Sequence, residues 1–408
     1  MAFKHPNWLL PAIIVGTLLG IAAGWFFGPQ MLVIDWIVGT LFLNALKMIV
    51  IPLVLFSLIL GVTALGSIKE VGSTGIRTLI YFLATTSLSV GLGLILVNWL
   101  QPGVGITLQT GLSAPATGPL SWKHLFLSFV PANIVKAMAE MDVLPVIIFS
   151  LLFGISLLAL GERGKPLVKI FELLNDTIIQ LVHFVLCFAP IGVFALVAAK
   201  LGESGGGPAI WMELKKIGGY AATVLLGLSL HGLVALPLIL FLFARRNPFV
   251  YLYRMSEAML TAFSTASSSA TLPVTMDCVE TKNNVSNRSA GFVLPLGATV
   301  NMDGTALYEA VAAIFIAQTY GIEMTLTQQL IIFLTATLAS IGAPGIPQAG
   351  LVTMVLVLKA VGLPLEGIAL ILTVDWLLDR FRTMINVWGD AVGAAVVERY
   401  LPHLQSSK

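Results

Sequence analysis

Charged residues are scarce in this sequence. Asp, Glu, Lys and Arg make up 10% of the 408 residues, against about a quarter in a soluble domain, and hydrophobic residues make up 57%. The net charge is only +2, and the sequence has no polybasic cluster of the kind that binds nucleic acid or anionic lipid headgroups. The composition therefore excludes a soluble domain and a nucleic-acid partner, and it predicts a protein surrounded by membrane lipid.

Cysteine is rare as well. The two cysteines, Cys187 and Cys278, lie far apart beside apolar helical sequence, which favours buried free thiols over a disulfide, and neither implies a metal site. No nucleophile with a neighbouring base is evident, and His183 and His231, on apolar helices, are interpreted as ordinary core residues. We therefore do not expect an enzyme.

Strand-like alternation of apolar and polar residues is also missing, so the expected fold class is an all-α integral membrane protein. A spanning helix needs roughly 18 to 20 apolar residues. We predict eight spans, the first of them uncleaved and the fourth broken near Pro131 and Pro145: 8–27, 33–63, 78–101, 123–160, 168–199, 209–243, 290–318 and 365–397.

Two further apolar segments, 250–280 and 325–360, are interrupted by "STASSSATLP" and "IGAPGIPQAG". Proline, glycine and serine are poor in helix interiors, so each segment is either a kinked span or a hairpin that enters and leaves on one side. If the N-terminus is cytoplasmic and both segments are hairpins, most loops that contain Lys or Arg lie on the cytoplasmic side, as the positive-inside rule expects. The C-terminus is then cytoplasmic as well. The exceptions are Lys200, Lys215 and Lys216, in an external loop. The hairpins then form an inverted repeat whose tips can line a substrate or ion site.

The stretch "VDWLLDRFRTMINVWGD", 374–390, concentrates charge inside the last predicted span. At about 100° per residue, six of its polar residues share roughly 100° of arc. They are Asp375, Asp379, Arg382, Thr383, Asn386 and Asp390, whereas Arg380 lies off this stripe. Because ionised groups are costly in a bilayer, the stripe must face protein, water or a bound ion.

The acidic residues of this stretch outnumber the basic ones by one, and Asp390 has no local partner. The charges either pair structurally or bind a cation, for which Asp, Asn and backbone carbonyls are suitable hard oxygen ligands. The planar fork of Arg382 matches a carboxylate. In the preceding span, Asn301, Asp303 and Thr305 lie within about one turn. A further intramembrane acid, Glu309, is either the structural partner of an arginine such as Arg380 or a proton carrier.

Four segments resemble the signature sequences of the dicarboxylate/amino acid:cation symporters, the glutamate transporter family: "STASSSATLPVT", "NMDGTALYEA", "GAPGIPQAG" and "VDWLLDRFRTMINVWGD". The resemblance covers the whole chain in order and length. It implies an elevator-type homotrimer of eight spans and two re-entrant hairpins. The implied units are scaffold spans 1 and 2 (1–77), transport-domain span 3 with its following loop (78–122), scaffold spans 4 and 5 (123–208) and a transport core (209–408).

The resemblance also implies the site residues. The substrate site would comprise Ser267, Ser268, Met302, Thr305, Ile346, Pro347, Gly350, Asp379, Arg382, Thr383 and Asn386. Asp379 would take the substrate ammonium, Arg382 the side-chain carboxylate, and Ser268 and Asn386 the α-carboxylate. Three sodium sites would use Gly297, Asn301, Asn386 and Asp390; Thr299, Met302, Ser340, Ile341 and Ala343; and Thr85, Thr86, Asn301 and Asp303.

A few residues distinguish the branches of this family from one another. Neutral amino acid exchangers of the family lack an arginine at the position of Arg382. The presence of this arginine therefore favours acidic substrates here. Arg380 and Glu309 resemble the excitatory amino acid transporters, where the acid is tied to proton and potassium coupling. Two residues depart from the family pattern: Phe82 replaces a tyrosine that is common beside the third sodium site, and Pro344 stands where animal members usually have alanine. The large external loops of animal members are missing, which favours a bacterial inner membrane.

We therefore expect a secondary active transporter for L-aspartate or L-glutamate, with Na⁺ as coupling ion, H⁺ as a further symported ion and K⁺ as a counter-transported one. The first alternative is H⁺-coupled uptake of acidic amino acids or C4-dicarboxylates, although Asp379 would have no ammonium to bind in a dicarboxylate. The second alternative is an anion channel. A polar stripe that binds cations and two gating hairpins fit a carrier better.

Overall fold

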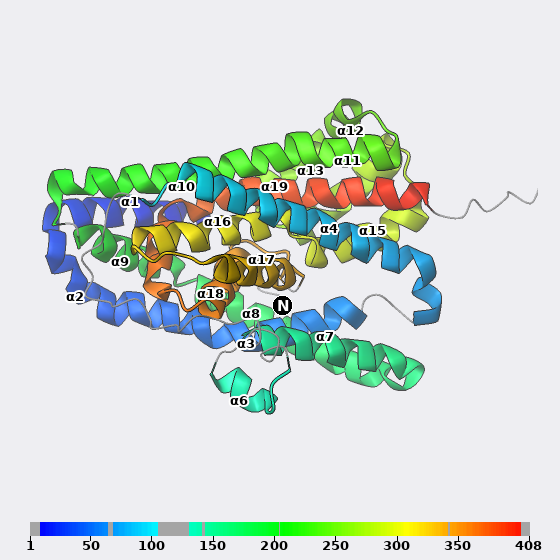
Figure 1. Ribbon diagram of the computed structural model, residues 1–408, viewed down its shortest axis with the longest axis horizontal. Coiled ribbons are helices and arrows are strands. Elements are labelled where there is room, and N and C mark those ends of the chain that lie inside the picture. Colours follow the sequence, from blue (N-terminus) through cyan, green and yellow to red (C-terminus); the bar gives the residue numbers. More distant parts are fainter. Residues whose placement is uncertain are drawn as a thin grey trace, which may run out of the picture.

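A computed structural model describes residues 9–63, 68–104, 130–140, 143–203, 205–341 and 343–400. Within these ranges all regular elements are helices, which confirms the all-α class (Figure 1). The first half comprises α1 (Leu9–Phe27), α2 (Leu32–Ile34), α3 (Thr40–Thr63), α4 (Ile68–Leu100), α6 (Ile134–Ala139), α7 (Val143–Ala159), α8 (Lys165–Leu186) and α9 (Ala189–Gly202).

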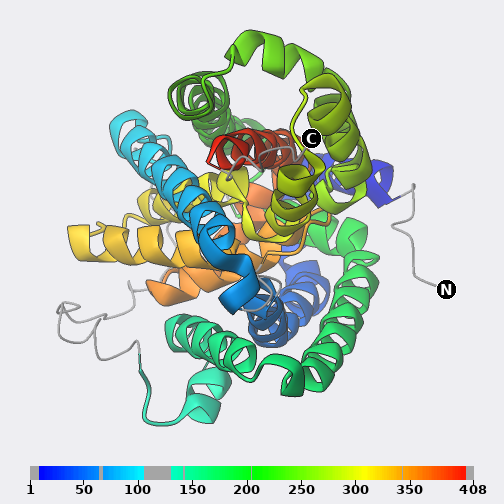
Figure 2. The ribbon, with the colours of Figure 1, turned by 90° about the vertical axis from the view of Figure 1, so that its right-hand side faces the viewer.

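The second half comprises α10 (Ile210–Leu230), α11 (Leu236–Ile239), α12 (Pro248–Arg254), α13 (Ser256–Thr265), α14 (Ser268–Asp277), α15 (Asn287–Val300), α16 (Asp303–Thr319), α17 (Leu326–Ser340), α18 (Ala349–Ala360) and α19 (Ile368–Arg399). Every residue of α16 from Asp303 to Ala317 is buried. This helix contacts α4, α10, α17, α18 and α19, so the core lies around it (Figure 2).

Five helical stretches in the described part of the chain are long and apolar enough to cross a bilayer: Pro11–Ile34, Trp36–Leu60, Gly75–Leu100, Leu214–Ala244 and Asn287–Thr319. The pair α8 and α9 would be a sixth. Two of the eight predicted spans fall outside this set, because α7 contains a shorter apolar stretch and the 32-residue α19 carries the charged stripe. The fold is that of a multi-pass membrane protein.

Three predicted spans are interrupted in the structure, as expected near Pro131 and Pro145 for the first of them. The span 123–160 starts only at Val143, and α6 precedes it as a separate short helix; residues 123–129 lie outside the described residues. The span 168–199 is bent by 55° between α8 and α9, where Pro190 occupies the first turn of α9 and has no N–H for the helix ladder. The span 290–318 breaks at Asn301 and Met302, both with non-helical backbone.

The first helix packs closely along α9. A Cβ atom at Gly16 would lie 2.3 Å from the carbonyl oxygen of Pro190, and one at Gly20 would lie 2.9 Å from that of Phe194. Glycine at four-residue spacing lets two helix backbones approach each other, which is a common way to join helices in lipid. This glycine stripe therefore fixes α1 against α9.

Both interrupted segments form paired helices. In the first, α13 packs against α14, and an ion pair between Glu257 and Lys282 joins their open ends, so the chain doubles back. The reversal occurs at Ala266, which has a left-handed φ of 49°, and Ser267 caps α14. In the second, α17 packs against α18 (Figure 1). We refer to these pairs as hairpin 1 and hairpin 2.

The tips of the two hairpins touch. The Ser267 hydroxyl donates a hydrogen bond of 2.5 Å to the carbonyl oxygen of Gly345, and the Ser269 amide donates to the same oxygen at 3.2 Å. A Cβ atom at Gly345 would lie 2.5 Å from the carbonyl oxygen of Ala298 on α15. Three helix interruptions are therefore gathered beside the polar stripe of α19.

Candidate substrate and cation site

The polar stripe of α19 is buried, as the helical wheel predicted. Its six residues, Asp375, Asp379, Arg382, Thr383, Asn386 and Asp390, are at most 6% exposed. Arg380, which the wheel placed off the stripe, is only part-buried and donates to the carbonyl oxygens of Phe263 and Ser264 at 2.5 and 2.9 Å. These acceptors are carbonyls at the end of α13 that the helix ladder leaves open. Arg380 therefore holds hairpin 1 on α19.

Arg382 lies at the centre of the stripe, with no exposed surface. Its Nη2 atom is 2.6 Å from Oδ1 of Asp379, and its Nη1 atom is 3.1 Å from Oδ1 of Asp375. The guanidinium carbon lies 3.8 Å from the centre of the Tyr308 ring. Among the described residues, Nε of Arg382 has no hydrogen-bond partner. A buried guanidinium with a spare donor is suited to binding a carboxylate.

Hairpin 2 lies directly against this centre. The backbone amide of Gln348 donates to Oδ2 of Asp379 at 2.8 Å, so this carboxylate bridges the hairpin and Arg382. A Cβ atom at Gly350 would lie 3.0 Å from Nη1 of Arg382, which only glycine avoids without displacement. The predicted residues Ile346 and Pro347 belong to the same tip and are half-buried.

Two of the other predicted substrate residues, Met302 and Thr305, contact Asn386. Its Nδ2 atom donates to Sδ of Met302 and to the Thr305 hydroxyl, both at 3.3 Å, and its Oδ1 atom accepts from the Gly304 amide at 2.8 Å. The Thr383 hydroxyl donates to the Asp379 carbonyl oxygen within α19. Ser267 and Ser268 are both buried in hairpin 1. The predicted substrate residues thus come from α16, α19 and both hairpin tips.

The first predicted sodium set is largely assembled. Nδ2 of Asn301 donates to Oδ1 of Asp390 at 3.0 Å, which gives Asp390 the partner that its own helix lacks. A Cβ atom at Gly297 would lie 2.3 Å from the same oxygen, so the carboxylate fills the place of a side chain. Asn386 also belongs to this set, but its Nδ2 atom donates to Met302 and Thr305 of the substrate group.

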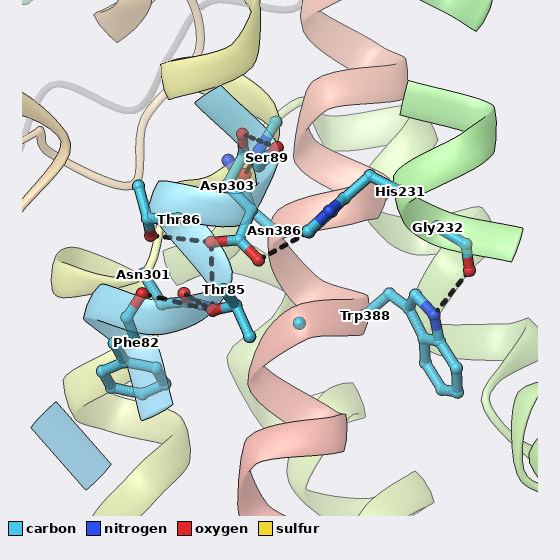
Figure 3. A network of polar contacts seen from close by, with 12 residues as sticks. Phe82, Thr85, Thr86, Ser89, His231, Gly232, Asn301, Asp303, Asn386 and Trp388 are labelled. Atoms are coloured by element: carbon cyan, nitrogen blue, oxygen red, sulfur yellow. Dashed lines mark hydrogen bonds and ion pairs between the residues drawn. The ribbon is translucent and has the colours of Figure 1, made fainter. Parts of the chain in front are cut away.

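The third predicted sodium set meets at Asp303 (Figure 3). Oδ1 of Asp303 accepts from the Thr86 hydroxyl at 2.7 Å and from the Thr85 hydroxyl at 3.3 Å. The Thr85 hydroxyl also lies 3.5 Å from Oδ1 of Asn301. Hydroxyl, amide and carboxylate oxygens are the ligands that hard cations prefer, so these residues fit a sodium ion. Within α4, the Thr85 hydroxyl also lies 3.2 Å from the carbonyl oxygen of Phe82.

The second predicted sodium set has no hydrogen bond between its two parts among the described residues. Thr299 and Met302 lie at the break between α15 and α16, whereas Ser340, Ile341 and Ala343 lie at the end of α17. The Thr299 hydroxyl donates to Leu296 and the Ser340 hydroxyl donates to Thr337, each within its own helix.

Sequence reasoning missed His231. This residue was interpreted as an ordinary core histidine, but its Nε2 atom lies 2.9 Å from Oδ2 of Asp303, and neither side chain has exposed surface (Figure 3). The signal was available, because a polar side chain in the middle of an apolar span usually has a partner inside the protein. The position of that partner in the sequence could not be deduced from spacing.

Glu309 is fully buried and accepts a hydrogen bond from the Thr353 hydroxyl on α18. One interpretation of the sequence made it the structural partner of an arginine such as Arg380, but Arg380 itself bonds to hairpin 1. Oε2 of Glu309 has no hydrogen-bond partner among the described residues. A carboxyl group that contacts a hydroxyl in an apolar setting is suited to exchanging a proton.

Comparison with known sequences gives a consistent result. Residues 9–400 match the sodium:dicarboxylate symporter family. The chain is 40% identical to excitatory amino acid transporter 3 of Mus musculus and of Homo sapiens, over 97% of this chain and 86% of each relative. It is 39% identical to neutral amino acid transporter B(0) of Bos taurus, over 97% of this chain and 80% of the relative. The chain therefore belongs to the sodium:dicarboxylate symporter family.

Proposed function

We propose that the protein is a secondary active transporter that takes up L-aspartate or L-glutamate together with Na⁺. The observation that carries this proposal is the arrangement of Arg382 between Asp375 and Asp379, beneath the hairpin tips. Relatives of similar identity include transporters named for excitatory and for neutral amino acids, so overall similarity does not choose between them. The buried arginine favours a substrate with a second carboxylate.

Substrate binding would replace contacts that these residues now make with each other. The substrate's side-chain carboxylate would take the place of Asp379 beside Arg382, and its ammonium group would bind to Asp379. Ser268 and Asn386 would hold the α-carboxylate, with Met302, Thr305, Thr383 and the tips of both hairpins around it. Arg382 and Asp379 would each keep a partner of opposite charge, whereas the α-carboxylate would be held by neutral hydrogen-bond donors.

Sodium ions would bind to the three predicted sets and link the helix breaks to one another. Asn301 lies in both the Asp390 group and the Asp303 group, so occupancy of one site would affect the geometry of the other. An ion at Thr299, Met302, Ser340, Ile341 and Ala343 would fix the end of α17 relative to α15. Hairpin 2 would then close over the substrate, which couples the cation gradient to uptake.

We further propose that Glu309 carries a symported proton and that Arg380 takes part in counter-transport of K⁺. Glu309 faces hairpin 2 through Thr353, and Arg380 faces hairpin 1, so each is placed to affect one gate. Any effect of one residue on the other would have to pass through α19 and the hairpins rather than through direct contact.

The proposed architecture is a homotrimer with an elevator mechanism, in which hairpins 1 and 2 are re-entrant and the two ends of the chain are cytoplasmic. The scaffold would comprise residues 1–77 and 123–208, and the transport unit would comprise 78–122 and 209–408. The proposed location is a bacterial inner membrane. Within the proposed scaffold α1 packs against α9, and α3 packs against α7 and α8, whereas α16 packs against α4, α10, α17, α18 and α19 of the proposed transport unit, which supports this division.

Uptake of radiolabelled aspartate and glutamate into liposomes that contain the purified protein tests the function, with Na⁺, H⁺ and K⁺ gradients imposed separately. An inward Na⁺ gradient should drive uptake, and unlabelled succinate should compete poorly because it has no ammonium group for Asp379. Uptake driven by H⁺ alone, or succinate competition equal to that of aspartate, would favour the H⁺-coupled alternative. Unitary currents without saturable uptake would favour a channel.

A further inference from the structure

His231 contacts the Asp303 cation group from the side opposite to its threonines. The imidazole Nε2 atom lies 2.9 Å from Oδ2 of Asp303, while the Thr85 and Thr86 hydroxyls both donate to Oδ1. The two oxygens of one carboxylate are therefore divided between two kinds of partner (Figure 3). A carboxylate oxygen accepts hydrogen bonds, so the tautomer of His231 that carries its proton on Nε2 can donate to Oδ2.

The backbone around His231 is held in place by α19. Residues His231–Ala235 form a π-helical turn, which is rare and often occurs at functional sites. The indole Nε1 of Trp388 donates to the carbonyl oxygen of Gly232 at 2.9 Å. A Cβ atom at Gly232 would lie 2.4 Å from Cδ1 of Ile385, so the end of that α19 side chain packs directly against this turn. The imidazole is thus positioned by a second helix as well as by its own.

We propose that His231 is a positioning residue for the cation site at Asp303. Its N–H group fixes Oδ2 of Asp303, so that Oδ1 is directed toward Thr85, Thr86 and Asn301, where a sodium ion would bind. The inference rests on the proposed sodium site and adds a residue that does not itself bind the ion. Groups that orient metal-binding carboxylates typically change metal affinity by about 10- to 100-fold.

A purely structural role would give a different result from a positioning role. A structural histidine would affect folding and all binding reactions together, whereas a positioning histidine would affect the Na⁺ requirement alone. The chemistry of the replacement also matters. The amide nitrogen of glutamine can reach the place of Nε2, whereas that of asparagine corresponds to Nδ1 and falls short of Asp303. His231→Gln and His231→Asn are therefore a matched pair.

The experiment measures binding of radiolabelled aspartate to the purified protein over a series of Na⁺ concentrations, with choline keeping the ionic strength constant. His231→Asn should raise the Na⁺ concentration for half-maximal binding roughly tenfold, and His231→Gln should stay near the wild type. At saturating Na⁺, aspartate affinity should be similar in all three proteins. Trp388→Phe, which keeps an aromatic ring but removes the N–H anchor, should raise the Na⁺ requirement about fivefold.

Several outcomes would overturn the inference. Equal Na⁺ requirements for the wild type and His231→Asn would exclude a positioning role, as would an equal loss in the Gln and Asn variants. If the Asn variant fails to fold, two other results would still contradict the inference. One is a tenfold higher Na⁺ requirement in His231→Gln, and the other is a wild-type Na⁺ requirement in Trp388→Phe. Wild-type binding that needs no Na⁺ would instead overturn the proposed function, and the inference with it.

Discussion

Oδ1 of Asp379 lies 2.6 Å from Nη2 of Arg382, and Oδ2 of Asp379 accepts a hydrogen bond from the Gln348 amide of hairpin 2. One carboxylate therefore connects the gate to the residue that we expect to bind the substrate. Substrate binding at Arg382 must disturb this connection, because a guanidinium has a limited number of donors in a fixed plane. The relationship would link substrate binding at Arg382 directly to the position of hairpin 2.

Arg382→Lys should weaken aspartate binding by roughly tenfold or more although it keeps the charge. A lysine ammonium cannot present a planar two-point fork, and it loses the stacking on Tyr308. Equilibrium binding of radiolabelled aspartate and alanine would measure the change. Arg380→Lys provides the matched control, because that arginine contacts carbonyl oxygens of hairpin 1. Unchanged aspartate affinity in Arg382→Lys would contradict the assigned role.

Gly297→Ala should raise the Na⁺ concentration needed for uptake by at least about tenfold. The new Cβ atom would lie 2.3 Å from Oδ1 of Asp390 and would displace the carboxylate from Asn301. Uptake measured over a series of Na⁺ concentrations checks this expectation. Gly291→Ala, on the same helix, is the control, since its nearest neighbour would be 3.6 Å away. Similar Na⁺ dependence in the two variants would argue against a cation at Asp390.

Glu309→Gln should abolish net uptake and leave exchange of internal for external aspartate intact. Glutamine keeps the size and the hydrogen bond with Thr353 but cannot take up and release a proton. Net uptake and exchange can be separated by loading liposomes with K⁺ or with unlabelled aspartate. Glu323→Gln, an exposed position, serves as control. The proposal fails if the Glu309 variant keeps the wild-type dependence of net uptake on internal K⁺.

Gly16→Ala should destabilise the protein by about 1 to 3 kcal/mol, because overpacking forces two backbones apart. Its Cβ atom would lie 2.3 Å from the carbonyl oxygen of Pro190. Thermal unfolding of the purified protein would show a lower midpoint. Gly218→Ala has no heavy atom within 4 Å of the new Cβ and should leave the midpoint near that of the wild type. A stable Gly16→Ala protein would mean that the stripe does not fix α1 against α9.

The sequence was most informative where a pattern repeats within one helix. The apolar runs predicted the all-α membrane class, and helical spacing predicted that Asp375, Asp379, Arg382 and Asp390 share one buried face. The Ser-rich and Gly/Pro-rich interruptions marked both hairpins, because those residues are unfavourable in a helix interior. Such local preferences operate over a few residues and can be deduced without knowledge of the fold.

Contacts between distant parts of the chain could not be predicted in this way. The break at Asn301 carries neither proline nor glycine at its centre, and its backbone shape depends on surrounding helices. Glu309 and Arg380 both lie in charged motifs, yet they contact different hairpins.

The amino-acid sequence by itself determined which faces of the helices are polar and where the helices are interrupted, because propensity and periodicity are local. Only the tertiary structure decided which polar groups meet. It joined His231 to Asp303 across 72 positions and Asn301 to Asp390 across 89. The physical reason is that a buried polar group must find a partner somewhere in the protein, but many partners satisfy that need until helix packing selects one.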